Sequence, residues 1–185
     1  MHEEMSRDAT QRMSKCVALL KEHYRKMRTG RANTGLLDGI KVDYYGSEVP
    51  LAQVASLSVE DARTIVISTW DKSAVAAVEK AILKSDLGLT PNTAGQVIRL
   101  PLPPMTEERR KDLTKVARHE AENARVAVRA VRRDLMNELK DMLKEKLISE
   151  DDDRRVQDEI QKLTDRHVHD IDQVLAEKEK ELLQV

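Results

Sequence analysis

The fold is decided by a long, uninterrupted stretch that follows the last proline of the chain. Residues 106–144 read TEERRKDLTKVARHEAENARVAVRAVRRDLMNELKDMLK, without Pro or Gly. Apolar side chains recur there at steps of three or four residues, the period of one helix face. Thr106 can cap the first turn. A helix of about 40 residues would be roughly 60 Å long. Its predicted apolar seam is Leu113, Ala117, Ala121, Ala124, Val128, Val131, Leu135, Leu139 and Met142.

Two further helices flank this stretch. Residues 4–29 predict a helix that ends before Gly30. Ser149 followed by four acidic residues resembles a capped helix start, and apolar residues from Val156 to Leu182 continue the pattern. A helix with one apolar stripe cannot bury it alone, so we expect an elongated three-helix bundle. The predicted seam of the first helix is Met5, Ala9, Met13, Cys16, Leu20, Tyr24 and Met27.

Residues 31–104 break the helical pattern, since they hold five of the six glycines and all five prolines. Residues 40–44, 63–70 and 97–100 have the composition of strands, and a short helix with Val78 and Ile82 inward lies between the last two. This order predicts a small β/α domain. The expected fold class is therefore α+β and mainly α, with residues 1–30 and 105–185 as the bundle and 31–104 as the insert.

Two segments of chain join the insert to the bundle, near residues 29–31 and 101–105. Two links prevent free rotation but permit bending, so we expect a hinge between two domains. Prolines stiffen the second link because the ring fixes φ. The expected hinge residues are Gly30, Arg31, Pro103 and Pro104.

Charge is unevenly distributed in this chain of net charge −1. Residues 106–133 carry nine basic and five acidic side chains, whereas residues 150–185 carry six and twelve. Such polarity suits a binding surface. The single cysteine, Cys16, fits a reducing compartment. The charged N-terminus does not resemble a signal peptide, and no apolar run is long enough to cross a membrane. We therefore expect a cytoplasmic protein.

A basic ridge is predicted along the helix of residues 106–144. On a helical wheel its members share an arc of about 100° beside the apolar seam, and Glu122 is the one acidic residue among them. Arg presents a planar fork that matches phosphate, so the ridge favours contacts with phosphate groups. Arg132 lies closest to the seam, where its stem can pack. The basic ridge consists of Lys111, Lys115, Arg118, Arg125, Arg129, Arg132 and Arg133.

Two alternatives to nucleic-acid binding remain open on the residues alone. The ridge could be a solvated face paired with acids on neighbouring helices, or part of a coiled-coil adaptor for an acidic protein. A small enzyme that uses the insert would need convergent polar groups. The sequence contains no phosphate-binding loop and no nucleophile elbow. His167 and His169 are two residues apart, on different helix faces. We therefore expect no enzymatic activity, no cofactor and no metal.

Several segments, in this order and spacing, resemble the bacterial ribosome recycling factor family over nearly the whole chain. The chain is identified as a member of that family on these segments: residues 28–32 (RTGRA), 43–46 (DYYG), 59–64 (VEDART), 77–82 (AVEKAI), 85–89 (SDLGL), 101–104 (PLPP), 106–110 (TEERR), 124–129 (ARVAVR), 132–134 (RRD) and 149–155 (SEDDDRR).

The resemblance implies an L-shaped, monomeric protein whose long arm is the three-helix bundle. It implies binding to rRNA of the large ribosomal subunit after termination. With elongation factor G and GTP, such a protein splits the ribosome and frees mRNA and tRNA, hydrolysing nothing itself. One departure from the family pattern is Gly35, which is expected to loosen the first link. The ribosome-contacting arginines that the resemblance implies are Arg28, Arg31, Arg129, Arg132 and Arg133, and the ridge adds Arg125.

Overall fold

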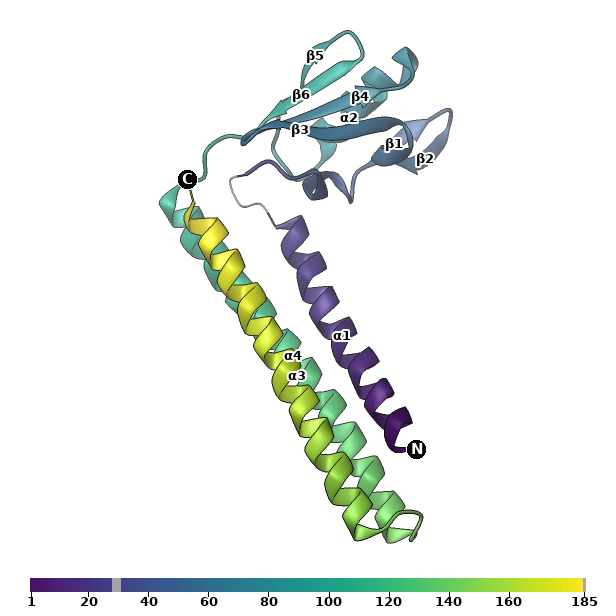
Figure 1. Ribbon diagram of the computed structural model, residues 1–185. Helices are drawn as coiled ribbons and strands as arrows, with labels where there is room; N and C mark the ends of the chain where they lie inside the picture. Colours follow the sequence, from purple (N-terminus) through teal and green to yellow (C-terminus); the bar gives the residue numbers. More distant parts are fainter. Residues whose placement is uncertain (28–30, 185) are drawn as a thin grey trace. The chain divides into compact units, whose positions relative to one another are not determined.

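The computed structural model describes residues 1–27 and 31–184 (Figure 1). The chain divides into two compact units, one of Met1–Tyr24 with Asp112–Glu181 and one of Arg25–Lys111 with Leu182–Val185. All three divisions, after Tyr24, Lys111 and Glu181, fall inside long helices. The domain boundaries predicted at residues 30 and 105 stay predictions. The hinge predicted at the two links, near residues 29–31 and 101–105, also stays a prediction.

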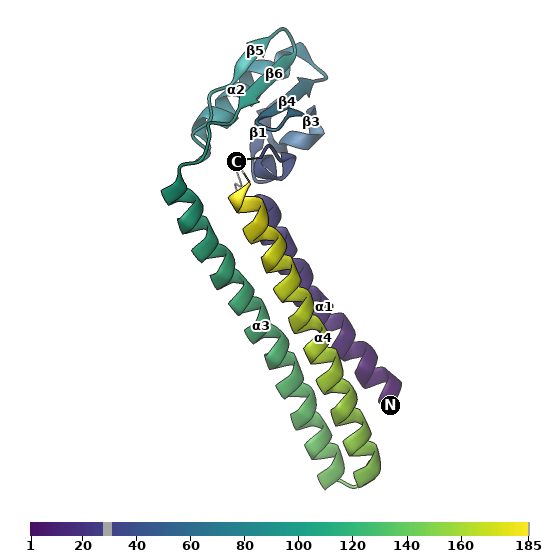
Figure 2. The same ribbon diagram turned by 60° about the vertical axis from the view of Figure 1, so that its left-hand side comes forward.

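Three long helices form the bundle, as the periodicity predicts. They are α1 (His2–Lys26), α3 (Glu107–Lys144) and α4 (Glu150–Leu183), and they lie side by side in both views (Figures 1 and 2). The two predicted caps are present. Arg109 donates its backbone N–H to Thr106 Oγ1 at 3.1 Å, and Asp152 donates its own to Ser149 Oγ at 3.1 Å. These bonds satisfy backbone donors that a helix start otherwise leaves without a partner.

The bundle core is made of small and aliphatic side chains. Every predicted seam residue of α3 is buried except Met142, which is half-buried. In α1 the prediction for Cys16 is wrong, because Val17 fills the seam and Cys16 is half-buried. The prediction for Met27 is also wrong, because the helix ends at Lys26 and Met27 is half-buried. Burial raises the pKa of the Cys16 thiol, which favours the unreactive form. Alanines fill three successive seam positions of α3, Ala117, Ala121 and Ala124, and all three are buried.

Polar side chains are also buried in the bundle, which the apolar pattern did not predict. Lys178 of α4 donates to the backbone oxygen of Tyr24 at 2.8 Å and lies 3.1 Å from Glu181. Tyr24 in turn donates its hydroxyl to the backbone oxygen of Ala117. A buried polar group is costly unless it is bonded, and these groups are. The contacts tie the end of α1 to both other helices.

A four-stranded antiparallel sheet carries the core of the inserted unit. Its order is β3 (Ala55–Asp61), β4 (Thr64–Thr69), β6 (Val97–Pro101) and β5 (Asn92–Ala94). Ile67 pairs with Ile98 and Ile65 with Leu100, and all four side chains are buried. The helix α2 (Val75–Lys84) adds Val78 and Ile82 to the same hydrophobic cluster. A separate ribbon pairs β1 (Lys41–Tyr44) with β2 (Ser47–Pro50).

The three predicted strands are confirmed as β1, β4 and β6, within a residue or so at each end. Three other strands were missed. The strand β5 is three exposed residues long, and β3 is exposed over its last four residues. Their hydrophobic signal is weak because little of either strand is buried. Three short 3₁₀ turns complete the unit: Thr34–Leu37, Leu51–Gln53 and Lys72–Ala74.

Gly35 stabilises its segment, contrary to the loosening expected from the sequence. It lies buried in the first 3₁₀ turn, whose cap Asn33 accepts from Gly35 N at 2.8 Å. The Asn33 side chain also donates to the backbone oxygen of Arg25 at 3.3 Å. A Cβ at position 35 would lie 2.9 Å from that same oxygen. The glycine is therefore needed for close approach of two backbone segments.

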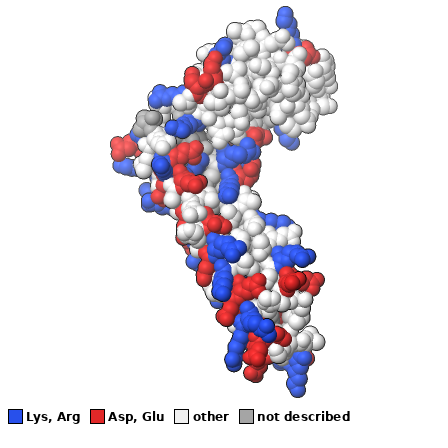
Figure 3. All heavy atoms as spheres, in the orientation of Figure 1, with Lys and Arg blue, Asp and Glu red and all other residues white. Residues whose placement is uncertain are grey.

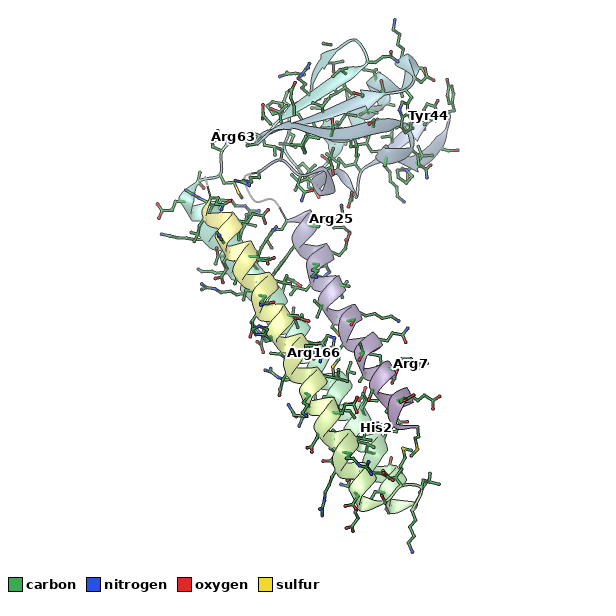
Figure 4. The ribbon with its side chains drawn as sticks, viewed as in Figure 1. His2, Arg7, Arg25, Tyr44, Arg63 and Arg166 are labelled. Carbon is green, nitrogen blue, oxygen red and sulfur yellow. The ribbon has the colours of Figure 1, made fainter. Side chains whose placement is uncertain are left out.

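Both link segments are anchored on one turn of the sheet. Ala32 donates its N–H to the oxygen of Ala62 at 2.7 Å, and Leu102 donates to the oxygen of Arg63 at 2.6 Å. These acceptors form the β3–β4 turn. Figure 4 places Arg63 at the opposite end of this unit from Tyr44. The two ends of the insert are thus bonded to consecutive residues, Ala62 and Arg63, of one β-hairpin.

Candidate nucleic-acid interface

The basic ridge lies on α3 along its border with α4. Arg118, Arg125 and Arg132 are spaced by seven residues, so they fall on nearly the same line of the helix. All three contact α4, while the other ridge residues lie further out on α3. The ridge members nevertheless meet very different partners, and these partners decide which of them can receive a phosphate.

Two ridge arginines are held by carboxylates of α4. Arg118 Nε lies 2.7 Å from Glu179 Oε1. Arg125 donates from Nε and from a terminal nitrogen to Asp172 Oδ1 at 2.9 and 2.7 Å, and to Glu122 at 3.0 Å. Burial opposes the charge of Arg125, but these carboxylates outweigh it and raise its pKa. For Arg118 and Arg125 the alternative of pairing across helices is therefore right.

Arg132 has a neutral anchor. Its Nε donates to Gln161 Oε1 of α4 at 2.7 Å, in a partly buried site. Gln161 Nε2 donates in turn to Asp165 Oδ1 at 2.9 Å. Within the described residues no carboxylate lies within ion-pair distance of Arg132. Its stem packs beside the core and its charge stays uncompensated, as expected for the ridge residue nearest the seam.

Arg129 and Arg133 are exposed beside Arg132. The side chain of Arg129 is 52% exposed and its closest carboxylate, Glu122, is 3.9 Å away. Arg133 has no ion pair within residues 1–27 and 31–184. Three guanidinium groups within five residues of one helix therefore present charge to solvent, and the one ion pair found for them in the described residues is the long contact of Arg129 with Glu122. This trio, Arg129, Arg132 and Arg133, forms the candidate interface.

The other predicted site residues contribute less to this group. Lys111 pairs with Glu107 at 3.2 Å within the first turns of α3. Arg31 is exposed and belongs to the other compact unit. Arg28 and Gly30 lie outside the described residues. Pro103 and Pro104 are exposed in the second link. Arg125 is the member least available to a phosphate, because its side chain is only 18% exposed.

Charged side chains cover much of the visible bundle surface, whereas the inserted unit shows few on the same face (Figure 3). Lys162 and Arg166 of α4 are both exposed, and Figure 4 labels Arg166 on that helix.

A metal site is not found among the described residues. His167 is buried, with Nδ1 2.7 Å from the oxygen of Leu163 and Nε2 3.3 Å from Ser14 Oγ. Both ring nitrogens therefore have partners, as in a core histidine. Within the same ranges, no helix combines the length and the apolar character needed to cross a bilayer.

Gln161 is the residue that the sequence analysis missed. A signal was available in the spacing of α4, where Asp165, Asp172 and Glu179 recur every seven residues. On an antiparallel neighbour this series can face Arg132, Arg125 and Arg118 in turn. Arg125 pairs with Asp172 and Arg118 pairs with Glu179. Arg132 does not pair with Asp165 and binds Gln161 instead.

Comparison with known proteins agrees with this architecture. The model of the family "Ribosome recycling factor" matches residues 20–183. The ribosome-recycling factor of Thioalkalivibrio sulfidiphilus (strain HL-EbGR7) is 58% identical over 185 residues, 100% of each chain. That of Legionella pneumophila (strain Paris) is 57% identical over the same full lengths.

Solved structures give the same answer at full length. A solution structure of the ribosome recycling factor has a TM-score of 0.79 and 42% identity, covering 100% of this chain and 98% of that one. A second has a TM-score of 0.68 and 44% identity, with 99% of each covered. It belongs to models of the T. thermophilus factor and E. coli elongation factor G bound to the E. coli post-termination complex. These matches confirm the predicted fold class and the predicted function in ribosome recycling: the chain belongs to the ribosome recycling factor family.

Proposed function

We propose that this protein binds rRNA of the large ribosomal subunit through Arg129, Arg132 and Arg133 of α3. With elongation factor G and GTP, it then splits the post-termination ribosome into subunits and frees mRNA and tRNA. The observation that carries the binding site is that, among the described residues, Arg132 and Arg133 have no ion pair and Arg129 has only a long one, 3.9 Å from Glu122. The names of the relatives and the neighbour bound beside elongation factor G support the reaction.

RNA is the ligand that this surface suits best. A guanidinium offers parallel N–H groups to the oxygens of one phosphate. Each phosphate contact also releases condensed counterions, which makes binding strongly salt-dependent. A helix of 38 residues presents its side chains at fixed spacing, so the ridge is ordered before it meets RNA. Less conformational freedom is then lost on binding.

We propose that the protein acts as a monomer and hydrolyses no nucleotide itself. Elongation factor G would supply GTP hydrolysis, and the bundle would supply a rigid arm held on the large subunit. The anchoring of Ala32 and Leu102 on one hairpin turn makes the insert a unit that can be pushed as a whole. Purified protein should release no phosphate from GTP without elongation factor G. Turnover by the protein alone would overturn this part.

Splitting is tested with purified post-termination ribosomes in a sucrose gradient. Protein, elongation factor G and GTP together should convert the ribosomes to subunits, and omission of any one should leave them intact. Arg132→Glu should prevent the conversion. Arg7→Glu on α1 makes the same charge change at an exposed position, where the side chain is labelled in Figure 4, and should not. Full splitting by the Arg132→Glu variant would remove the proposed site.

A further inference from the structure

We propose that Gln161 of α4 is a positioning residue that holds Arg132 toward phosphate while leaving its charge uncompensated. This inference rests on the proposed function, since it concerns the same surface. The evidence is a break in a repeating pattern of contacts between α3 and α4, at a position where a ridge arginine meets an amide.

The pattern is a set of bridges spaced by seven residues on both helices. Arg118 meets Glu179 at 2.7 Å, and Arg125 meets Asp172 at 2.7 Å. One further step along α3 gives Arg132, and one further step along α4 gives Asp165. That third ion pair does not form. Gln161, one turn before Asp165, accepts from Arg132 at 2.7 Å instead.

An amide is suited to stand between these two charged groups. A guanidinium only donates hydrogen bonds and an ionised carboxylate only accepts them, whereas an amide does both. Gln161 therefore turns Oε1 to Arg132 and Nε2 to Asp165, at 2.7 and 2.9 Å. The opposite orientation would place its NH₂ group against another donor. Arg132 and Asp165 together thus fix the amide, and the amide fixes the guanidinium.

The hydrogen bond to Gln161 leaves the two terminal nitrogens of the Arg132 guanidinium available. Gln161 takes only Nε, and in the part of the chain that the structure describes no partner is found for the two terminal nitrogens. Those nitrogens form the fork that grips a phosphate. A carboxylate at position 161 would instead bind the fork in bidentate fashion and cancel its charge. Arg132 would then resemble Arg125, which is a structural residue.

The first test is Gln161→Glu in the full chain, measured as affinity for purified large ribosomal subunits over a series of salt concentrations. We expect binding roughly tenfold weaker at moderate salt, because one charge-assisted phosphate contact is lost. The slope of log affinity against log salt should fall by about 0.7 to 0.9, the value for one phosphate. A merely structural role for Gln161 would lower the melting temperature without changing the salt slope, so the slope is the deciding readout.

Gln173→Glu is the matched control. It introduces the same charge on the same helix at an exposed position, and Gln173 makes no recorded side-chain bond within the described ranges. Its affinity and salt slope should equal those of the wild type. If Gln173→Glu weakens binding as much as Gln161→Glu, general charge on α4 explains the effect and the proposal is wrong.

A double-mutant cycle separates this inference from the proposed function. If Gln161 acts through Arg132, then Gln161→Glu should have no further effect in an Arg132→Ala background. An equal loss in both backgrounds, or wild-type affinity of Gln161→Glu, would overturn the role of Gln161 alone. Wild-type affinity of Arg132→Ala would overturn the proposed binding site as well. Should Gln161→Glu fail to fold, Gln161→Met decides, because it removes the acceptor of Arg132 without adding charge. Weaker binding that disappears in the Arg132→Ala background supports the proposal, and unchanged binding contradicts it.

Discussion

Two stretches of α3 carry the same residue type on the same stripe and have different surroundings. Arg118 and Arg125 each lie 2.7 Å from a carboxylate of α4. In the stretch 129–133, Arg129 has only a long ion pair, 3.9 Å from Glu122, and the described residues provide none for Arg132 and Arg133. A paired guanidinium contributes little field outside the protein, whereas an unpaired one attracts anions. The partner on the neighbouring helix therefore separates structural arginines from binding ones.

The largest effect is expected from reversing the charge of the unpaired stretch. Arg129→Glu with Arg132→Glu removes two phosphate contacts and adds repulsion, so affinity for large subunits should fall more than about 100-fold. Helical circular dichroism should be unchanged, since neither side chain belongs to the apolar seam. Co-sedimentation with large subunits measures the loss. Arg7→Glu with Lys15→Glu is the control, with the same charge change at exposed positions of α1.

Single alanine variants should distinguish the two stretches, because one variant should mainly lower stability and the other should mainly lower ribosome affinity. Arg125→Ala leaves Asp172 without two hydrogen bonds, so the free energy of unfolding should fall by about 1 kcal/mol with little change in ribosome affinity. Arg132→Ala should lower affinity about tenfold or more and lower stability less. Urea unfolding and subunit binding are measured on both. Equal effects of the two variants on either quantity would contradict the distinction.

The paired end of α3 is also where Tyr24 contacts the core. Burial raises the pKa of Tyr24 to about 12 from its ordinary value of 10.0. The folded state therefore holds this proton more tightly, and that stability is complete below pH 10 and is lost as pH rises toward 12. Tyr24→Phe should cost about 1 kcal/mol at pH 8, through the bond to the Ala117 oxygen.

The pH profile checks this interpretation. Between pH 10 and 12 the melting temperature of the Tyr24→Phe variant should decline less steeply than that of the wild type. Ribosome affinity at neutral pH should be unchanged, because Tyr24 lies outside the unpaired stretch. Parallel profiles for the two proteins would show that Tyr24 does not titrate on unfolding.

The smallest effect on subunit affinity and on stability is expected from a change in the second link. Pro103→Ala with Pro104→Ala removes the φ restraint from two exposed residues. Subunit affinity and melting temperature should stay close to the wild type, whereas splitting with elongation factor G should slow if the link transmits force. Gradient analysis over time measures the rate. An unchanged rate would show that the stiffness of this link plays no part in splitting.

The sequence alone was sufficient for the bundle, because its signals are local. The seam of α3, the caps Thr106 and Ser149, and the absence of Pro and Gly each act within a few residues. The family resemblance added the function in ribosome recycling. The inserted unit was predicted less completely, since β3 and β5 are edge strands and an edge strand buries too little for a clear pattern.

The sequence also placed the ridge on one face of α3, since helical geometry fixes which residues share a face. It did not predict which ridge arginines are paired. That depends on the register of α4 against α3, which the packing of both apolar seams decides together. Asp172 and Gln161 are 47 and 29 residues from the arginines they bind. Tertiary packing therefore made Arg125 a structural residue and left the charge of Arg132 available.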